Sequence, residues 1–226
     1  MIAQMGCKIY KSSKIRSDAL RERLENYRNE IEVEGLSGRL IENIEDFTLL
    51  DQGVQFKFLY DYVVPIQYRQ EIQRVLRTAD AEIRITDPQD SNLYFVYSSS
   101  NIADSIRVRL SKILSGTDNF IEKISIPPNV LRDILEDEVE AIEIKYGWWD
   151  NIETYARKGA LKGNLRQSRY YRSFEQTGDP TSIIFESNST GRTIKITSKG
   201  IITFYGQDIT QQEIEDYIIG TIISGV

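Results

Sequence analysis

Apolar side chains repeat along this sequence at two spacings, and each spacing predicts a different kind of element. Ile102, Ile106 and Leu110 recur every four positions, as on one face of a helix. The same helical spacing predicts helices over residues 17–28, 66–78, 101–114, 129–135, 150–159 and 210–222. Alternating positions rich in β-branched and aromatic residues predict strands instead. These strands are expected over residues 31–44, 47–50, 54–64, 82–86, 93–97, 120–126, 139–146, 182–187, 192–197 and 201–205.

Proline and glycine set the expected ends of two segments. Pro65 is expected to end the long strand over residues 54–64, so that residues 66–78 follow as a helix. A loop is expected over residues 173–181, because this stretch contains Gly178-Asp179-Pro180.

Capping signals predict where two helices begin. Thr210 and Glu213 have the spacing of a capping box and mark the clearest helix start in the chain. Asp150 and Glu153 have the same spacing with a carboxylate at each end. A helix is therefore expected from Asp150 to about Gly159.

The order of these elements indicates an α+β protein with mainly antiparallel sheets. The best domain boundary is Ser115–Asp118, which divides the chain into an N-terminal subdomain, residues 1–116, and a C-terminal subdomain, residues 117–226. Each subdomain is expected to end in a β-hairpin that leads into an amphipathic helix. One explanation is duplication of a sheet-and-helix unit, and the other is that strand–turn–strand–helix is a common α+β arrangement.

The last hairpin and helix, residues 192–223, resemble the closing strands and helix of a half-repeat of the TATA-binding protein. The resemblance rests on Ser198-Lys199-Gly200, on Gly206 after five further residues, and on a helix start shortly afterwards. In that family a curved sheet binds the minor groove of DNA and phenylalanines wedge between base steps. The resemblance implies a curved sheet here, with Phe204 or Phe95 as the nearest wedge candidates.

The composition excludes several kinds of catalytic centre. The 226 residues include no histidine and one cysteine, Cys7. Mechanisms that need an imidazole, and zinc sites built from histidine and cysteine, are therefore excluded. A single cysteine forms no internal disulfide, and no apolar run is typical of a signal peptide or a membrane span. The sequence predicts a cytoplasmic protein, and it indicates no catalytic residue, metal site or cofactor.

Charge is distributed unevenly along the chain. The formal net charge of −6 opposes a general attraction to nucleic acid. Residues 154–174, however, contain six basic residues, interleaved tyrosines and no acidic residue. Guanidinium groups pair with phosphates and tyrosine rings stack on bases, so this segment is the predicted nucleic-acid site. Phosphates are expected at Arg157, Lys158, Lys162, Arg166, Arg169 and Arg172, whereas Tyr170 and Tyr171 stack or position the ligand.

Other roles remain open for this basic segment. Residues 133–153, just before it, carry eight acidic residues against one lysine and could neutralise it within the fold. The segment is otherwise an arm that docks on an acidic protein, or a solvated loop whose charge aids solubility. The main functional alternative is an assembly protein that binds an acidic partner or itself through the C-terminal sheet and the isoleucine-rich last helix.

A metal-dependent enzyme is the second alternative. Glu143 and Lys145 have the Glu-x-Lys form that one nuclease superfamily uses on a strand, where carboxylates hold Mg²⁺ and the lysine steadies the attacking water. Asp133 or Asp137 would have to supply a further carboxylate, but both are expected on a helix rather than on the separate strand which that chemistry needs.

The tandem tryptophans at 148 and 149 allow two interpretations. Next to Gly147 they form a ligand platform, or they fill the core at the end of a strand. Taken together, the patterns favour a non-enzymatic nucleic-acid-binding protein that uses residues 157–172. Because the attraction is one of charge, its affinity is expected to fall steeply with added salt.

Overall fold

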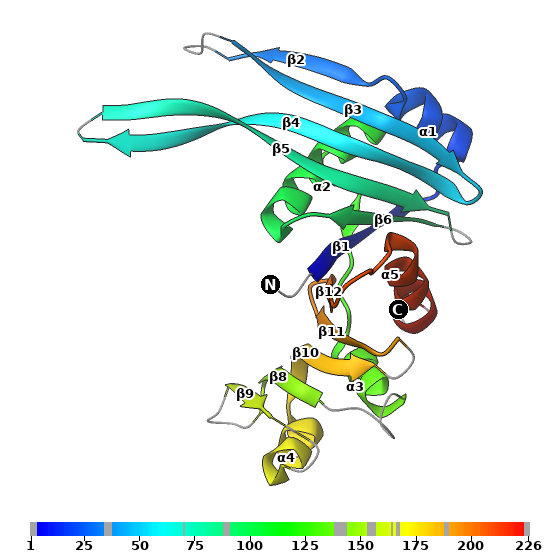
Figure 1. The fold of residues 1–226 in the computed structure, drawn as a ribbon, viewed down its shortest axis with the longest axis vertical. Coiled ribbons are helices and arrows are strands. Elements are labelled where there is room, and N and C mark those ends of the chain that lie inside the picture. Colours follow the sequence, from blue (N-terminus) through cyan, green and yellow to red (C-terminus); the bar gives the residue numbers. More distant parts are fainter. Residues whose placement is uncertain are drawn as a thin grey trace. The chain divides into compact units, whose positions relative to one another are not determined.

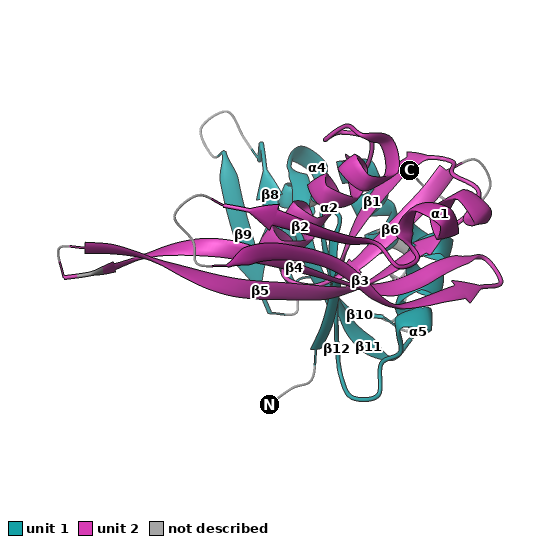
Figure 2. Cartoon of the chain, turned by 90° about the horizontal axis from the view of Figure 1, so that it is seen from above, with its two compact units in different colours: residues 1–7, 123–226 teal, residues 8–122 magenta. Residues whose placement is uncertain are grey.

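The computed structural model describes residues 4–33, 38–69, 71–87, 91–137, 144–152, 157–163, 165, 168–187 and 190–223. The chain forms two compact units (Figure 2). Unit 2 comprises residues 8–122, and unit 1 comprises residues 1–7 and 123–226. The division thus falls between Glu122 and Lys123, whereas the sequence predicted one between residues 116 and 117. No local sequence feature indicates that residues 1–7 belong with the C-terminal unit.

Helices and mostly antiparallel strands occur together in both units, which confirms the predicted α+β class (Figure 1). No helix in the described part of the chain is long and apolar enough to cross a membrane. In unit 2 the strands follow the spatial order β2-β3-β4-β5-β6-β1. Its elements are β1 (Gln4–Ser13, shared with unit 1), α1 (Ser17–Leu24), β2 (Arg28–Glu32), β3 (Arg39–Leu50), β4 (Gly53–Tyr68), β5 (Glu71–Thr86), β6 (Ser91–Tyr97) and α2 (Ser100–Ser115).

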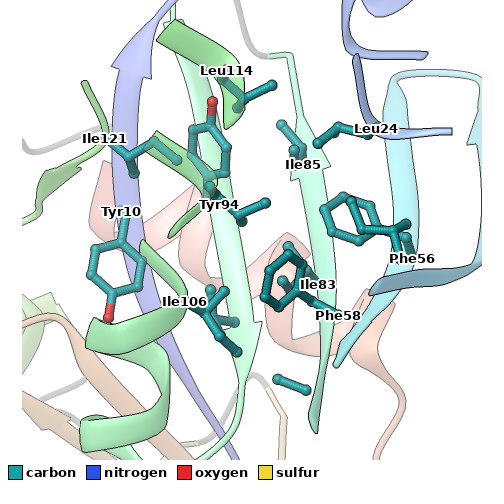
Figure 3. Close-up of a cluster of buried hydrophobic side chains, with 14 of the residues drawn as sticks. Tyr10, Leu24, Phe56, Phe58, Ile83, Ile85, Tyr94, Ile106, Leu114 and Ile121 are labelled. Atoms are coloured by element: carbon teal, nitrogen blue, oxygen red, sulfur yellow. The ribbon is translucent and has the colours of Figure 1, made fainter. Parts of the chain in front are cut away.

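The core of unit 2 lies between this sheet and its two helices (Figure 3). Phe56 and Phe58 of β4 and Ile83 and Ile85 of β5 occupy alternate positions, and each is at most 2% exposed. Ile106 meets them from α2, where the predicted four-residue spacing holds. The alternation of apolar residues therefore predicted the buried face of these strands correctly.

The predicted helix over residues 66–78 is wrong. The segment belongs to a ribbon of β4 and β5, sixteen residues in each strand, with Arg69 in the connecting turn at a φ of 58°. Pro65 does not end β4 but pairs with Arg74 inside it. The pairing of β3 with β4 reaches only Tyr60, so Pro65 lies where its missing N–H breaks no bond to a second strand. Because the segment spans a hairpin turn, two alternating patterns combined into an apparent helical period.

The strands of unit 1 follow the spatial order β12-β11-β10-β8-β9. A two-residue strand, β7 (Glu122–Lys123), spans the division between the units and is all that forms of the predicted strand over residues 120–126. The strands in this order are β8 (Ile144–Asp150), β9 (Lys158–Lys162), β10 (Asp179–Ser187), β11 (Arg192–Thr197) and β12 (Ile201–Tyr205). The helices of unit 1 are α3 (Pro128–Asp137), α4 (Arg169–Thr177), α5 (Gln211–Tyr217) and a π-helical turn, η2 (Ile218–Ile222).

The helix predicted from Asp150 to Gly159 is also wrong. Asp150 ends β8, and Asn151 follows with a φ of 55°, a left-handed conformation that no helix continues. The Asn151 amide donates to the Arg157 carbonyl oxygen, and the chain returns as β9 alongside β8. The hydrogen bonds gained along the edge of the sheet replace those of a short isolated helix.

The predicted loop over residues 173–181 is likewise replaced by regular structure. Ser168 caps α4 by accepting a hydrogen bond from the Tyr170 amide, and the helix continues to Thr177. Strand β10 begins two residues later, at Asp179. Packing of the partly buried Phe174 against Trp149 stabilises the last turns of this helix despite the glycine and proline that follow.

Each unit contains the predicted hairpin that leads into a helix, namely β5–β6–α2 in unit 2 and β11–β12–α5 in unit 1. The predicted capping box is confirmed. The Glu213 amide donates to Thr210 Oγ1 at 3.2 Å, and the Thr210 amide donates to Glu213 Oε2 at 2.8 Å. Duplication of a common unit remains a hypothesis.

Candidate nucleic-acid interface

The sheet of unit 1 has one face covered by the helices of the same unit and one face that these helices leave uncovered. On the covered face Ile183, Ile194 and Phe204 are at most 1% exposed. The ring of Phe204 meets Tyr217 of α5 edge-on, with centroids 5.5 Å apart. Since side chains alternate along a strand, the residues next to these on each strand point to the uncovered face.

Trp149 anchors the covered face beneath α4. Its indole contacts Tyr171 and Phe174 edge-on, at centroid separations of 6.1 and 5.6 Å. The indole lies back across its own strand over Gly147, where a Cβ atom would overlap it. Gly159 of β9 leaves similar space, because a Cβ atom there would lie 2.6 Å from the ring of Phe174. Glycine at both positions lets α4 and the Trp149 ring approach the backbone closely.

Trp148 points the opposite way and lies on the uncovered face. Its ring packs against Tyr146 with centroids 4.2 Å apart and planes inclined at 37°. The Lys195 ammonium, from β11, lies 5.8 Å from the centroid of the indole. A hollow of about 400 Å³ opens beside the ring, bordered by β9 and by Thr181 and Ser182 of β10. We call the following set the Trp148 face: Tyr146, Trp148, Lys158, Lys162 and Lys195.

The register of β9 brings its two lysines to this face. Lys162 is paired with Tyr146, Ala160 with Trp148, and Lys158 with Asp150. Residues directly opposite each other in an antiparallel pair project from the same side of the sheet. Both lysines are exposed, and the Lys158 ammonium lies 3.8 Å from the Asp150 carboxylate, a surface contact of little energetic weight.

A β-bulge in β8 adds Lys145 to the margin of this face. The register of β8 against β10 shifts between Ile184 and Phe185, so that Lys145 is the extra residue. Its ammonium lies 2.9 Å from Glu186 Oε2 and donates to Thr193 Oγ1 at 3.2 Å. Lys145 is therefore held by neighbouring strands, and Glu143, its partner in the predicted nuclease motif, lies outside the described residues.

Within the described ranges, no three His, Cys, Asp or Glu side chains converge in a way that could hold a metal ion. Of the two aspartates that the sequence offered, Asp133 is exposed on α3. The side chain of Asp137 lies outside the described part of the structure.

The other predicted contact residues lie elsewhere. Arg169, Tyr170 and Arg172 are exposed on α4, which packs on the covered face. Arg169 donates to the Tyr170 hydroxyl at 2.8 Å and lies over its ring. Tyr171 is only 6% exposed, because it packs against Trp149.

The structure therefore brings Lys158 and Lys162 together with Trp148 and separates them from Arg169 and Arg172. Arg157 is exposed just before β9, and Arg166 lies outside the described residues. Sequence reasoning missed the contribution of Tyr146 and Lys195 and left the two tryptophans undivided. The alternation of side chains along β8 and β11 indicates which residues of each strand share a face. The register of the strands is needed to show that Lys195 lies on the same face as Trp148.

Other sequence candidates are buried. Phe95 and Phe204, the wedge candidates implied by the resemblance, are 0% and 1% exposed. Ile214, Ile218 and Ile222 of the last helix are fully buried, so the isoleucine-rich face considered for protein docking is already covered.

No protein-family model matches the chain, and no curated protein matches it either.

Proposed function

We propose that unit 1 binds single-stranded nucleic acid across the Trp148 face. The observation that supports this function is the partly exposed indole of Trp148, which packs on Tyr146 near the Lys195 ammonium, on a sheet face that none of the described helices of unit 1 covers. Stacking of one base on an aromatic ring stabilises such a complex by roughly 1–3 kcal/mol. The ring is preorganised by Tyr146, which lowers the entropy lost when a base binds.

Cations lie on both sides of the stacking ring. In the sheet order, β9 with Lys158 and Lys162 flanks β8 on one side, and β11 with Lys195 lies beyond β10 on the other. A strand that crosses the sheet would meet an ammonium group, then the aromatic pair, then a second ammonium group. Lysine ammonium groups bind phosphates as point charges, so the phosphates need no fixed orientation.

An unpaired strand fits this face better than a duplex does. Bases in a duplex are stacked on one another and present only their edges, whereas the flat aromatic pair requires an exposed base face. The net charge of −6 does not prevent binding, because exposed charges are screened over about 8 Å at physiological ionic strength. Carboxylates that lie farther away than this therefore oppose binding only weakly.

Fluorescence anisotropy with a labelled single-stranded pyrimidine oligonucleotide tests the proposal. The wild-type protein should bind it more tightly than the matching duplex, and added salt should weaken the complex. Trp148→Ala should weaken binding about tenfold, the equivalent of one lost stacked base. Tyr170→Ala is the matched control, since Tyr170 is exposed on α4 and lies outside the face. Absence of any salt-sensitive complex, or equal affinity of Trp148→Ala and wild type, would overturn the proposal.

A second pair of variants separates this face from the basic segment as a whole. Lys158→Gln, Lys162→Gln and Lys195→Gln together should reduce both the affinity and its salt dependence. Arg169→Gln with Arg172→Gln should change neither. The reverse result would assign binding to α4 and exclude the Trp148 face.

A further inference from the structure

The β4–β5 ribbon of unit 2 extends past the rest of its own sheet. We call its outer part, residues 62–68 and 71–78, the ribbon arm. Pairing of β3 with β4 reaches only Tyr60, and pairing of β6 with β5 covers only Glu82–Thr86. Among the described strands, each strand of the arm therefore has the other as its one neighbour. Figure 2 shows the arm projecting beyond α1 and α2 of the same unit.

Apolar side chains line both faces of the ribbon arm. Val64 is paired with Val75 on one face, and Val63 with Leu76 on the other. Ile72 is 73% exposed and Leu76 46% exposed, the first of these being the highest value among the large hydrophobic residues described as exposed. An isolated two-stranded ribbon is only marginally stable in water, and exposed apolar strands with open edges are typical association sites.

The charge of the arm indicates what covers it. Arg74 and Arg77 of the arm, together with Arg69 in its connecting turn, outnumber the single acidic residue, Glu71, so the arm is positive. The chain as a whole carries −6, which makes the remainder of the molecule more acidic still. Two arms would repel each other, whereas an arm and the acidic remainder of another copy attract. A second copy of the chain would thus both cover the apolar side chains of the arm and attract its positive charge.

We propose that the ribbon arm docks on the acidic body of a second copy of this chain, and that the two copies exchange arms. Reciprocal exchange gives a closed two-fold dimer in which the same contact forms twice. The contact buries Ile72 and Leu76 and brings the arginines of the arm close to carboxylates of the partner copy. It uses unit 2 and is independent of the nucleic-acid proposal, which uses unit 1.

Sedimentation velocity over a range of protein concentrations tests this inference. The wild-type chain should form a dimer, and Ile72→Asp combined with Leu76→Asp should raise its dissociation constant about 100-fold or more. Leu49→Asp is the matched control, because Leu49 is 47% exposed on β3 and lies outside the arm. It should leave the dimer unchanged. Circular dichroism verifies that all variants are folded.

A charge variant tests the choice of occupant and serves if the aspartate variants fail to fold. Arg77→Glu should weaken the dimer, and salt should weaken the wild-type dimer while affecting this variant less. A wild-type chain that stays monomeric at high micromolar concentration would refute the inference. So would dissociation by Leu49→Asp as large as that by the arm variants, or a dimer that Arg77→Glu strengthens, because the arms would then meet each other.

Discussion

Trp148 and Trp149 are consecutive residues of β8, yet their indoles lie on opposite faces of the unit 1 sheet. Trp149 is 1% exposed and contacts Tyr171 and Phe174 of α4, whereas Trp148 is partly exposed and packs on Tyr146. Strand geometry alone produces this division, because successive side chains alternate between faces. One ring is thereby committed to the core, and the other is available to a ligand.

Replacement of the two tryptophans should therefore have different effects on stability. Trp149→Ala should lower the free energy of unfolding by about 3–5 kcal/mol, the cost of a large cavity in a packed core. Trp148→Ala should lower it by less than about 1.5 kcal/mol, since part of that ring already faces water. Urea denaturation monitored by circular dichroism measures both values. Equal losses would contradict the assignment of the two rings to different faces.

Gly147 should not tolerate a side chain. A methyl group there overlaps the indole of Trp149, so Gly147→Ala should destabilise the protein by about 1–3 kcal/mol through overpacking. Gly38→Ala is the control, because a Cβ atom at Gly38 meets nothing within 4 Å. Thermal denaturation of both variants measures the effect, and equal melting temperatures would contradict the placement of the Trp149 ring over Gly147.

Cys7 should resist thiol reagents in the folded protein. Burial raises the pKa of the Cys7 thiol, and the carboxylate of Glu215 raises it further, so almost no thiolate exists at mildly alkaline pH. Ellman's reagent should label Cys7 only after unfolding in denaturant. Rapid stoichiometric labelling of the native protein would show that the thiol is accessible after all.

The capping box of α5 should make stability depend on acid. Hydrogen bonds from the backbone and then the side chain of Thr210 lower the pKa of Glu213 below its usual 4.5. A carboxyl group whose pKa is lower in the folded state stabilises that state at neutral pH, and this contribution is lost as pH falls through the lowered pKa. Glu213→Gln should therefore be less stable than wild type at pH 7, and the difference should shrink below pH 4.5.

The same cap offers a second check that does not involve titration. Thr210→Ala removes the oxygen that accepts a hydrogen bond from the Glu213 amide, and it should cost about 1 kcal/mol. Thermal denaturation at neutral pH provides the measurement. Gln207 is exposed just outside the cap, and Gln207→Ala should leave the midpoint unchanged.

Local chemistry predicted much of the secondary structure correctly. The Thr210–Glu213 cap and the alternation of Phe56 and Phe58 each depend on neighbours a few residues away, and both appear as expected. The errors fall where pairing with a neighbouring strand supplied the hydrogen bonds. Residues 66–78 pair across a hairpin turn, and Lys158 and Gly159 pair with β8, although the sequence predicts helices over residues 66–78 and 150–159.

The features of the candidate site likewise divide into those that the sequence indicates and those that only the structure reveals. Sequence by itself determined the α+β class, the absence of imidazole chemistry and the concentration of basic residues over residues 154–174, because these depend on residue type and short spacing. Only the tertiary structure decided that Lys195 joins Lys158 and Lys162 around Trp148 while Arg169 and Arg172 lie on a helix across the sheet. The order and register of strands bring such residues together, and they are set by long-range packing that no short window of sequence contains.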